Sequence, residues 1–331
     1  MYRSFSELQP DMVLDAVEAF GVEVSGHCYP LNSYENRVFQ VGVEDGPPVI
    51  AKFYRPGRWT IEQIKEEHGF AAKLSTAGVK TAKNLVSAAG DTIVEFDGFY
   101  CSVQQKIMGR MPEVDNFDNL YQLGQIIGEM HAATGSYQLT VRNVFDPQAM
   151  GSDNADFLAA SWLPKKQLAL YRKCVNALLQ RIDQCLPADF SDSFLSIHGD
   201  CHLSNVLMTN SGPVLLDFDD VMSGPAMQDL WMFLAGDKIQ QKKQLSELIE
   251  GYQESLDFPE QQLGWVPALR ALRVINYTAW LAKRWSDPAF PLAFPWFNSE
   301  DFWIAHIKEL QQLTKDFDAG LDATPARGGN F

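Results

Sequence analysis

Three oxygen-bearing side chains, Asp200, Asn205 and Asp217, are spaced in a way that could support catalysis. Asp200 and Asn205 are five residues apart, and Asp217 follows twelve residues later. Phosphoryl transfer needs a carboxylate that accepts a hydroxyl proton, together with oxygen ligands for the Mg²⁺ that bridges nucleotide phosphates. Mg²⁺ keeps several waters and phosphate oxygens, so one Asn and one Asp are enough protein ligands. The residue types and their spacing therefore indicate phosphoryl-transfer chemistry.

Short apolar runs surround these side chains and should hold them in place. Residues 193–197 lead into the first polar group, residues 206–208 follow it, and residues 214–216 precede the second. Runs of this length are typical of buried strands. The turn signal Asn-Ser-Gly-Pro at residues 210–213 predicts that the last two runs form a hairpin. We expect this hairpin to hold the three polar side chains at one edge of a rigid support.

Other interpretations of these residues remain open. An isolated Asp is usually a turn former, and a His beside an apolar strand is usually a satisfied core group. A transition-metal hydrolase is a sharper alternative, because His198, Asp200 and His202 alternate and would share one face of a strand. That alternative leaves Asn205 and Asp217 without a function.

Length, charge and cysteine content limit the class of protein. A chain of 331 residues, 46% of them hydrophobic, can form two domains or lobes with a large core. The net charge of −15 argues against nucleic acid as a partner. Five scattered cysteines without a C-x-x-C pair indicate reduced thiols, and the chain shows no leader and no run of eighteen apolar residues. We expect a cytoplasmic protein without membrane contact, and a disordered tail at residues 323–331.

The N-terminal part contains residues suited to hold phosphates. The polar turn at residues 31–36 precedes a predicted strand at 37–41, and its backbone N–H groups could form an anion-binding nest, with a plain hairpin turn as the alternative. Neither G-x-G-x-x-G nor G-x-x-x-x-G-K-[ST] occurs, which excludes dinucleotide-binding and P-loop classes. In a predicted strand at 48–54, Lys52 parallels the lysine with which kinases pair the α- and β-phosphates. A surface lysine is the alternative there.

Two helices and a hairpin complete this part of the prediction. The first helix starts at Pro10-Asp11, with Asp11 as its N-cap, and ends at Gly21. The second runs from residues 59–60 to near residue 78 and carries Glu66 and Glu67 in its middle. One of these two should pair with the lysine of the preceding strand, unless both are solvated helix charges.

Asp97-Gly98 is a hairpin signal between strands predicted at 92–96 and 99–103. The second strand leads into a predicted hinge at 104–109. The backbone groups of such a hinge can bind the adenine of a nucleotide without leaving a side-chain signature. Gln105 and Ile107 are therefore predicted to contact adenine from their position alone.

The rest of the chain is predicted to be mainly helical. Amphipathic or apolar segments lie at residues 116–134, 167–186, 245–252 and 268–285, and a further helix is predicted from residue 224. His131, near the end of the first segment, is interpreted as structural. An aromatic, proline-rich segment at residues 287–297 could line an acceptor groove or could simply pack.

Residues 198–205, HGDCHLSN, resemble the H-G-D-x-H-x-x-N motif of aminoglycoside phosphotransferases, choline kinases and their relatives, which have a protein-kinase-like fold. The resemblance implies that Asp200 is the catalytic base. It implies that Asn205 and Asp217 hold Mg²⁺, which makes Asp217 a catalytic and a metal-binding residue. It also implies that His198 braces the loop and that His202 supports it rather than reacting.

The same resemblance assigns three more residues. Ser33, in the turn at 31–36, contacts ATP. Glu67 rather than Glu66 pairs with the strand lysine, because the glutamate of the family precedes an apolar-rich turn. The family pattern G-P-x-x-x-D implies that Asp229 caps backbone N–H groups of the catalytic loop, with N-capping of its own helix as the alternative.

Within this superfamily, nearly the whole chain is similar to bacterial stress-response kinases that phosphorylate serine and threonine. The similar segments are LNSYENRV from residue 31, KFYRP from 52, EEH from 66, HGDCH from 198, GPA from 224, QDLWM from 228 and WSDPAFP from 285. Residues 217–220 read Asp-Phe-Asp-Asp where that family can have Asp-Leu-Asp-Asp, and the apolar position is retained. The similarity implies an α+β, two-lobed protein-kinase-like fold. We expect a small β-rich N-terminal ATP-binding lobe at 1–106 and a larger, mainly helical C-terminal lobe at 107–322.

The function implied by this similarity is the ATP- and Mg²⁺-dependent phosphorylation of protein serine or threonine. The expected protein is a monomer that takes part in stress survival, and autophosphorylation is a possible further reaction. One alternative is a small-molecule hydroxyl kinase of the aminoglycoside or choline type, because the catalytic residues require only a hydroxyl near Asp200. A nucleotide-binding module without activity is the other alternative, and the intact Lys52, Asp200, Asn205 and Asp217 count against it.

Overall fold

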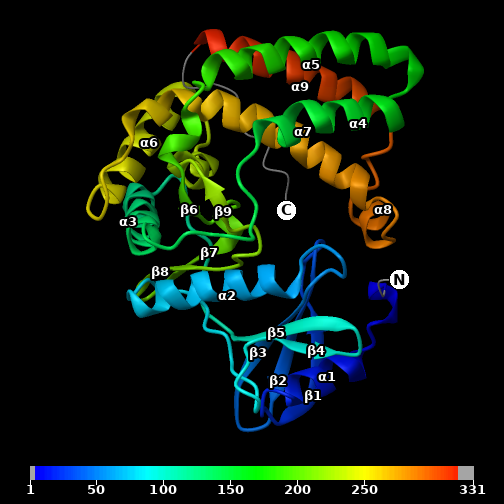
Figure 1. The fold of residues 1–331 in the computed structure, drawn as a ribbon, viewed down its shortest axis with the longest axis vertical. Coiled ribbons are helices and arrows are strands. Elements are labelled where there is room, and N and C mark those ends of the chain that lie inside the picture. Colours follow the sequence, from blue (N-terminus) through cyan, green and yellow to red (C-terminus); the bar gives the residue numbers. More distant parts are fainter. Residues whose placement is uncertain (1–3, 320–331) are drawn as a thin grey trace.

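The structure, a computed structural model, describes residues 4–319. The fold is α+β and has two parts, which Figure 1 shows one above the other. A five-stranded sheet with helices α1 (Pro10–Glu18) and α2 (Ile61–Thr76) forms the first part, and a mainly helical assembly forms the second. The predicted tail at 323–331 and the last residues of the predicted second lobe, 320–322, lie outside the described residues.

The sheet of the first part is antiparallel and has the order β1-β2-β3-β5-β4. Its strands are β1 (Val24–Pro30), β2 (Arg37–Val43), β3 (Gly46–Phe53), β4 (Val94–Phe96) and β5 (Phe99–Gln105). Strands β2 to β5 confirm the four predicted strands, whereas β1 has no counterpart among the predicted elements. In β3, Val49, Ala51 and Phe53 are buried in one cluster with residues of α1. Alternate residues of a strand share a face, so Lys52 faces the opposite side of the sheet.

Helix α1 begins at Pro10 as predicted, but its cap and its end differ from the prediction. Gln9 is the N-cap residue and Pro10 occupies the first helical turn, so Asp11 lies inside the helix. Proline is favoured at that position because it has no N–H to leave unsatisfied. The helix ends at Glu18, ahead of Gly21, whose φ of 73° is left-handed.

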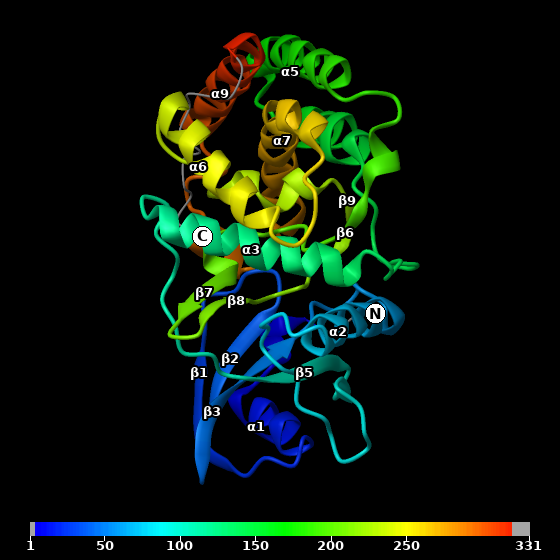
Figure 2. The same cartoon turned by 90° about the vertical axis from the view of Figure 1, so that its left-hand side faces the viewer.

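Helix α2 lies at the junction of the two parts, between the sheet and α3 (Phe117–Thr134), in both views (Figures 1 and 2). Its N-terminus is fixed by a capping box. The Oγ1 atom of Thr60 accepts the Gln63 N–H at 3.3 Å, and the side chain of Gln63 accepts the Thr60 N–H at 3.0 Å. Two orphan donors of the helix are satisfied in this way, which explains why the helix starts where the sequence predicts.

The second part is mainly helical and also contains two short strand pairs. Its further helices are α4 (Asn154–Ser161), α5 (Lys165–Cys185), α6 (Lys238–Tyr252), α7 (Val266–Arg284), α8 (Ala289–Ala293) and α9 (Glu300–Ala319). Strand β6 (Leu195–Ile197) pairs with β9 (Met222–Gly224), and β7 (Val206–Thr209) pairs with β8 (Gly212–Leu215). The β7-β8 pair confirms the predicted hairpin, whereas α4, α8 and α9 have no counterparts among the predicted helices. Within residues 4–319, no helix combines the length and apolar character that a membrane span requires.

The helix predicted from residue 224 is wrong. Strand β9 ends at Gly224, and two 3₁₀ turns, Ala226–Asp229 and Trp231–Phe233, follow it. The buried side chain of Gln228 donates to Gly199 O at 3.1 Å. This side chain and its neighbours serve the 198–205 loop, and such tertiary contacts override the local preference for a helix.

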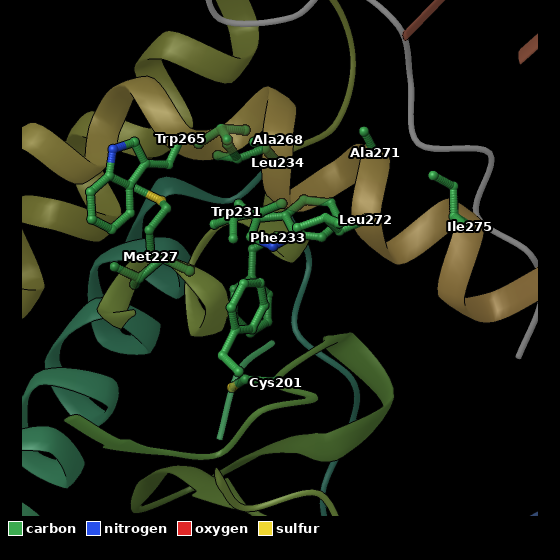
Figure 3. Close-up of a cluster of buried hydrophobic side chains, with 14 of the residues drawn as sticks. Cys201, Met227, Trp231, Phe233, Leu234, Trp265, Ala268, Ala271, Leu272 and Ile275 are labelled. Carbon is green, nitrogen blue, oxygen red and sulfur yellow. The ribbon is translucent and has the colours of Figure 1, made fainter. Parts of the chain in front are cut away.

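An apolar core fills the second part and reaches the polar 198–205 loop. It includes Trp231 and Phe233 from the 3₁₀ turns, Leu272 from α7, and the fully buried Cys201 (Figure 3). Because Cys201 directly follows Asp200, its packing in a dense interior anchors the loop that carries Asp200.

Glycines allow α3 and α6 to pack at very short range. A Cβ atom on Gly124 would lie 2.0 Å from Leu248 O, and one on Gly251 would lie 2.0 Å from Tyr121 O. Both distances are shorter than any real contact, so a side chain at either position would force the helices apart.

Replacement of Gly251 by Ala should therefore reduce the free energy of unfolding by about 1–3 kcal/mol, the usual cost of overpacking. Urea denaturation followed by circular dichroism would measure the change. Gly264→Ala is a matched control, because a Cβ atom there has no neighbour within 4 Å. The control should stay within about 0.5 kcal/mol of the parent chain. Equal stability of the two variants would contradict this account of the α3–α6 contact.

Candidate active site

A cleft of about 880 Å³ lies between the two parts and is lined by residues of both. The predicted site residues that line it are Ser33, Lys52, Gln105, Ile107, Asp200, His202, Asn205 and Asp217. The other three, Glu67, His198 and Asp229, are buried behind the lining. The hypothesis of phosphoryl transfer requires the three oxygen-bearing side chains to share a cleft with Lys52, and this arrangement is present.

Asp200 reaches the cleft from the loop between β6 and β7. Its Oδ1 atom accepts a hydrogen bond from Arg273 Nη1 at 2.6 Å, and its Oδ2 atom lies 3.4 Å from His202 Nε2. Burial acts to raise the pKa of Asp200, but the charge of Arg273 and the contact with His202 outweigh it and hold the pKa well below its usual range. Asp200 is therefore an ionised carboxylate at neutral pH.

Asn205 is tied to the same loop through its amide. Its Nδ2 atom donates to Asp200 O at 3.0 Å, and its backbone O accepts the Leu216 N–H at 2.9 Å. Because the NH₂ group is used within the loop, the side chain keeps its oxygen as an acceptor. An amide oxygen of this kind is a ligand suited to Mg²⁺.

Asp217 has a left-handed backbone conformation, with φ of 55°, which is uncommon for residues other than glycine. The turn sends Phe218 into the core, where its ring centroid lies 5.6 Å from that of Phe70. Asp217 remains at the cleft with 51% of its side chain exposed. Strain of this kind costs about 1–3 kcal/mol and persists only where the surrounding packing demands it, as the buried Phe218 does here.

Lys52 is enclosed by three carboxylates. Its Nζ atom lies 2.9 Å from Asp217 Oδ1, 3.2 Å from Asp219 Oδ1 and 3.4 Å from Glu67 Oε1. Burial lowers the pKa of Lys52, but the three carboxylates reverse this effect and raise the pKa well above its usual value. Burial also raises the pKa of Glu67 to about 7, although Lys52 opposes the shift. The structure thus fixes a charged ammonium group at the cleft.

The two neighbouring glutamates of α2 have different partners. Glu67 pairs with Lys52, as predicted. The carboxylate of Glu66 accepts the backbone N–H groups of Thr140, Val141 and Arg142 at 2.6, 2.9 and 2.8 Å, together with the Thr140 hydroxyl at 2.7 Å. Glu66 therefore fastens α2 to the second part and holds Glu67 in position, a contact that the sequence does not reveal.

Asp229 connects the 198–205 loop to a buried polar chain. Its carboxylate accepts the backbone N–H groups of His198 at 2.7 Å and Gly199 at 2.9 Å. The Nε2 atom of His131 lies 3.0 Å from the same carboxylate, and its Nδ1 atom lies 2.9 Å from the Tyr252 hydroxyl. Asp229 makes no side-chain cap for its own 3₁₀ turn, so the predicted capping of the loop is the observed one. His131 is structural, as predicted.

The two histidines of the motif point to different partners. His198 Nε2 lies 2.8 Å from Leu216 O, which joins the loop to the segment that follows β8. His202 Nδ1 accepts the Ser204 N–H at 3.2 Å, while its other ring nitrogen faces Asp200. Among the described residues, no three His, Cys, Asp or Glu side chains gather to hold a metal ion. The transition-metal alternative requires His198 and His202 to face one ion together with Asp200, but the two rings contact separate backbone groups.

The polar turn at 31–36 lines the cleft and is tied to the second part. Ser33 Oγ donates to Asn36 O at 3.1 Å. Glu35 Oε1 accepts from Arg284 Nη2 at 2.8 Å, and Glu35 Oε2 accepts from Trp280 Nε1 at 2.5 Å. The turn is thereby held over the cleft by α7.

The hinge follows β5 along the other wall of the cleft. Gln105, the last residue of that strand, donates its N–H to Lys83 O at 3.1 Å. This bond occupies the Gln105 backbone donor, and Gln105 and Ile107 both line the cleft.

Comparison with known proteins identifies the family. Residues 27–265 match the model of the phosphotransferase enzyme family, APH. The chain belongs to this phosphotransferase family. It is 40% identical to Stress response kinase A of Escherichia coli (strain K12), and 39% identical to Serine/threonine protein kinase RdoA of Salmonella typhimurium, over 94% of each chain in both cases.

Solved structures confirm the predicted two-lobed fold of these phosphotransferases. Amicoumacin kinase hAmiN, in complex with AMP-PNP, Ca²⁺ and Ami, has a TM-score of 0.72 at 20% identity, covering 97% of this chain and 96% of that one. A microcompartment-associated aminopropanol kinase also has a TM-score of 0.72, at 17% identity, covering 96% and 100%.

Two arginines of this phosphotransferase contact acidic site residues without any sequence signal. Arg273 of α7 binds Asp200, and Arg58 contacts Asp219 and, at 2.5 Å, Asp220. Each partner is distant along the chain, so neither motif spacing nor helical periodicity indicates the pairing. The sequence shows the adjacent Asp219 and Asp220, but it does not indicate Arg58 as their partner.

Asp229→Asn should reduce turnover by about 10- to 100-fold, because the loop that carries Asp200 would lose its fixed position. The new amide NH₂ group would face one of the two backbone N–H donors that the carboxylate accepts, which should lower the free energy of unfolding by about 1–3 kcal/mol. Phosphotransferase kinetics and urea denaturation would measure both effects. Asp183→Asn, at an exposed position of α5, is the control and should change neither. Normal turnover in Asp229→Asn would show that the capped loop does not position Asp200.

Proposed function

We propose that this phosphotransferase moves the terminal phosphoryl group of Mg²⁺-bound ATP to serine or threonine hydroxyls of a protein. The observation that carries the proposal is the convergence of Asp200, Asn205, Asp217 and Lys52 on one cleft. The names of the similar proteins, Stress response kinase A and Serine/threonine protein kinase RdoA, support a protein acceptor and a place in the response to stress. We also propose that the protein acts as a monomer in the cytoplasm.

The donor set of the cleft fits a nucleotide with a divalent ion. The exposed carboxylate of Asp217 and the amide oxygen of Asn205 are hard oxygen ligands of the kind that Mg²⁺ takes. Lys52 adds a fixed positive charge for phosphate oxygens. Ser33 belongs to the tethered turn and would contact the phosphates, while Gln105 and Ile107 of the hinge would border adenine.

The residues of the chain have distinct parts in such a reaction. The bound nucleotide supplies the phosphoryl group, and its metal ion neutralises charge on the phosphates. Asp200 orients the acceptor hydroxyl and takes its proton. Arg273 keeps Asp200 ionised, and Glu67 keeps Lys52 directed at the cleft. His198, His202 and Asp229 hold the loop and do not react.

A small-molecule hydroxyl is the second candidate acceptor. The structurally similar hAmiN and aminopropanol kinase are named for small molecules, and Asp200 requires only a hydroxyl within reach. Labelled ATP should be incubated with the purified protein and, separately, with lysate proteins or a panel of aminoglycosides, choline and sugars. Phosphate mapped to serine or threonine, including autophosphorylation, supports the proposal, whereas label only in small molecules rejects it. ATP binding without turnover on any acceptor would identify a nucleotide-binding module.

Asp200→Asn should reduce phosphoryl transfer by about 10²–10⁴-fold, because the acceptor hydroxyl would lose the base that takes its proton. Binding of a fluorescent ATP analogue should stay within about twofold of the parent protein, since the groups proposed to hold the nucleotide are retained. Single-turnover transfer and equilibrium binding would measure the two effects. Retained transfer in purified Asp200→Asn would reject Asp200 as the base.

Arg273→Ala should shift the acidic limb of the pH–rate profile towards higher pH. Asp200 acts as a base only when ionised, so activity falls as the pH drops through its pKa. Arg273 is a principal charge that lowers this pKa against burial, so its removal lets the pKa rise. The profile of kcat/KM against pH would show the shift, and Arg273→Lys, which keeps the charge, should show a smaller one. An unchanged limb in Arg273→Ala would contradict this role.

A further inference from the structure

Helix α7 has a charge opposite to that of the chain as a whole. The chain has a net charge of −15, but residues 266–284 contain three arginines, one lysine and no acid. Six residues of this helix line the cleft, namely Arg273, Asn276, Tyr277, Trp280, Lys283 and Arg284. Arg273, Tyr277, Trp280 and Arg284 follow helical spacing and share one face, with Asn276 and Lys283 on the adjacent stripe. One wall of the cleft beside Asp200 is therefore cationic.

Two of the three cations in this wall have carboxylate partners. Arg273 binds Asp200, and Arg284 binds Glu35 of the turn over the cleft. Each pair holds its acidic partner in position, which explains why these two arginines are present. Neither pair explains Lys283.

Lys283 has no carboxylate partner among the described residues. Its Nζ atom donates to the amide oxygen of Asn154 at 2.7 Å, and Asn154 in turn donates to Asn276 Oδ1 at 2.9 Å. The charge of Asp153 raises the pKa of Lys283 from longer range, but the Asp153 carboxylate accepts its hydrogen bond from Gln148 Nε2 at 2.8 Å. Burial and the charge of Arg284 lower the pKa of Lys283, so its charged form lacks compensation that an anion would supply.

We propose, on the basis of the protein-kinase function proposed above, that α7 selects acceptor segments that are acidic close to the serine or threonine. Lys283 contacts a carboxylate of the bound peptide, while Arg273 beside Asp200 marks the position of the acceptor hydroxyl. Lys283 and Arg273 are ten residues apart, which corresponds to about 15 Å along a helix. An extended peptide advances about 3.3 Å per residue and covers this distance in about four or five residues. The selected acid therefore lies about four or five positions from the acceptor.

The test compares three peptides that have one serine and differ only at the positions three to five residues to either side of it. These positions carry aspartate, alanine or lysine. The parent protein should phosphorylate the aspartate peptide with a kcat/KM about two- to fivefold above that of the alanine peptide, the range of a partly exposed ion pair. Lys283→Glu should abolish this preference and should favour the lysine peptide. Lys173→Glu, at an exposed position of α5 outside the cleft, is the matched control and should keep the parent preference.

Equilibrium binding of the same peptides, labelled with a fluorophore, separates the failure of this inference from the failure of the proposed function. Tighter binding of the aspartate peptide, lost in Lys283→Glu but kept in Lys173→Glu, supports the inference even if no peptide is phosphorylated. Equal treatment of the three peptides, preference for the lysine peptide in the parent protein, or absence of any peptide binding overturns it. Thermal denaturation would show that both variants are folded, so that a lost preference reflects the changed charge.

Discussion

The arrangement of the cleft depends on one buried charge, the ammonium group of Lys52. This residue belongs to the sheet, yet two of its three carboxylate partners, Asp217 and Asp219, belong to the second part of the molecule. Loss of one partner from a buried ion-pair network typically costs about 3–5 kcal/mol, because the remaining charge is left uncompensated. The third partner, Glu67, brings α2 into the same network. One charge therefore fixes the sheet, α2 and the segment after β8 relative to each other.

Further ion pairs close the cleft around this charge. They join Arg58 to Asp219 and Asp220, Arg55 and Arg37 to Asp287, and Glu35 to Arg284. Each links a segment of the first part to a segment of the second, and the side chains are partly buried. Charge-assisted hydrogen bonds of this kind are about twice as strong as neutral ones, and the arginine fork adds geometric specificity. The turn at residues 31–36 thus reaches its place over the cleft through fixed contacts.

Local signals in the sequence predict much of this structure, and the failures occur where distant contacts decide. The β7-β8 hairpin and the helices that follow caps are predicted because turn residues and periodicity act over a few positions. The spacing of Asp200, Asn205 and Asp217 likewise survives folding, since one loop and one hairpin carry all three. The pairing of Arg273 with Asp200 has no local signal, because it joins helices and loops that are adjacent only in the folded chain. The incorrect prediction of a helix after residue 224 has the same cause, because Gln228 makes a contact with the distant 198–205 loop.

Helix α7 connects the two ends of the site. Through Glu35 its C-terminal arginine, Arg284, holds the turn that covers the cleft, and through Arg273 its middle holds Asp200. Both contacts come from one rigid helix whose apolar residues, such as Leu272 and Ile275, are fully buried in the core. A displacement of this helix would therefore alter the positions of the covering turn and of Asp200 together, whereas a loop could move one without the other. An acceptor that binds to the cleft-lining face of α7 would thus contact the helix on which the positions of the turn and of Asp200 both depend.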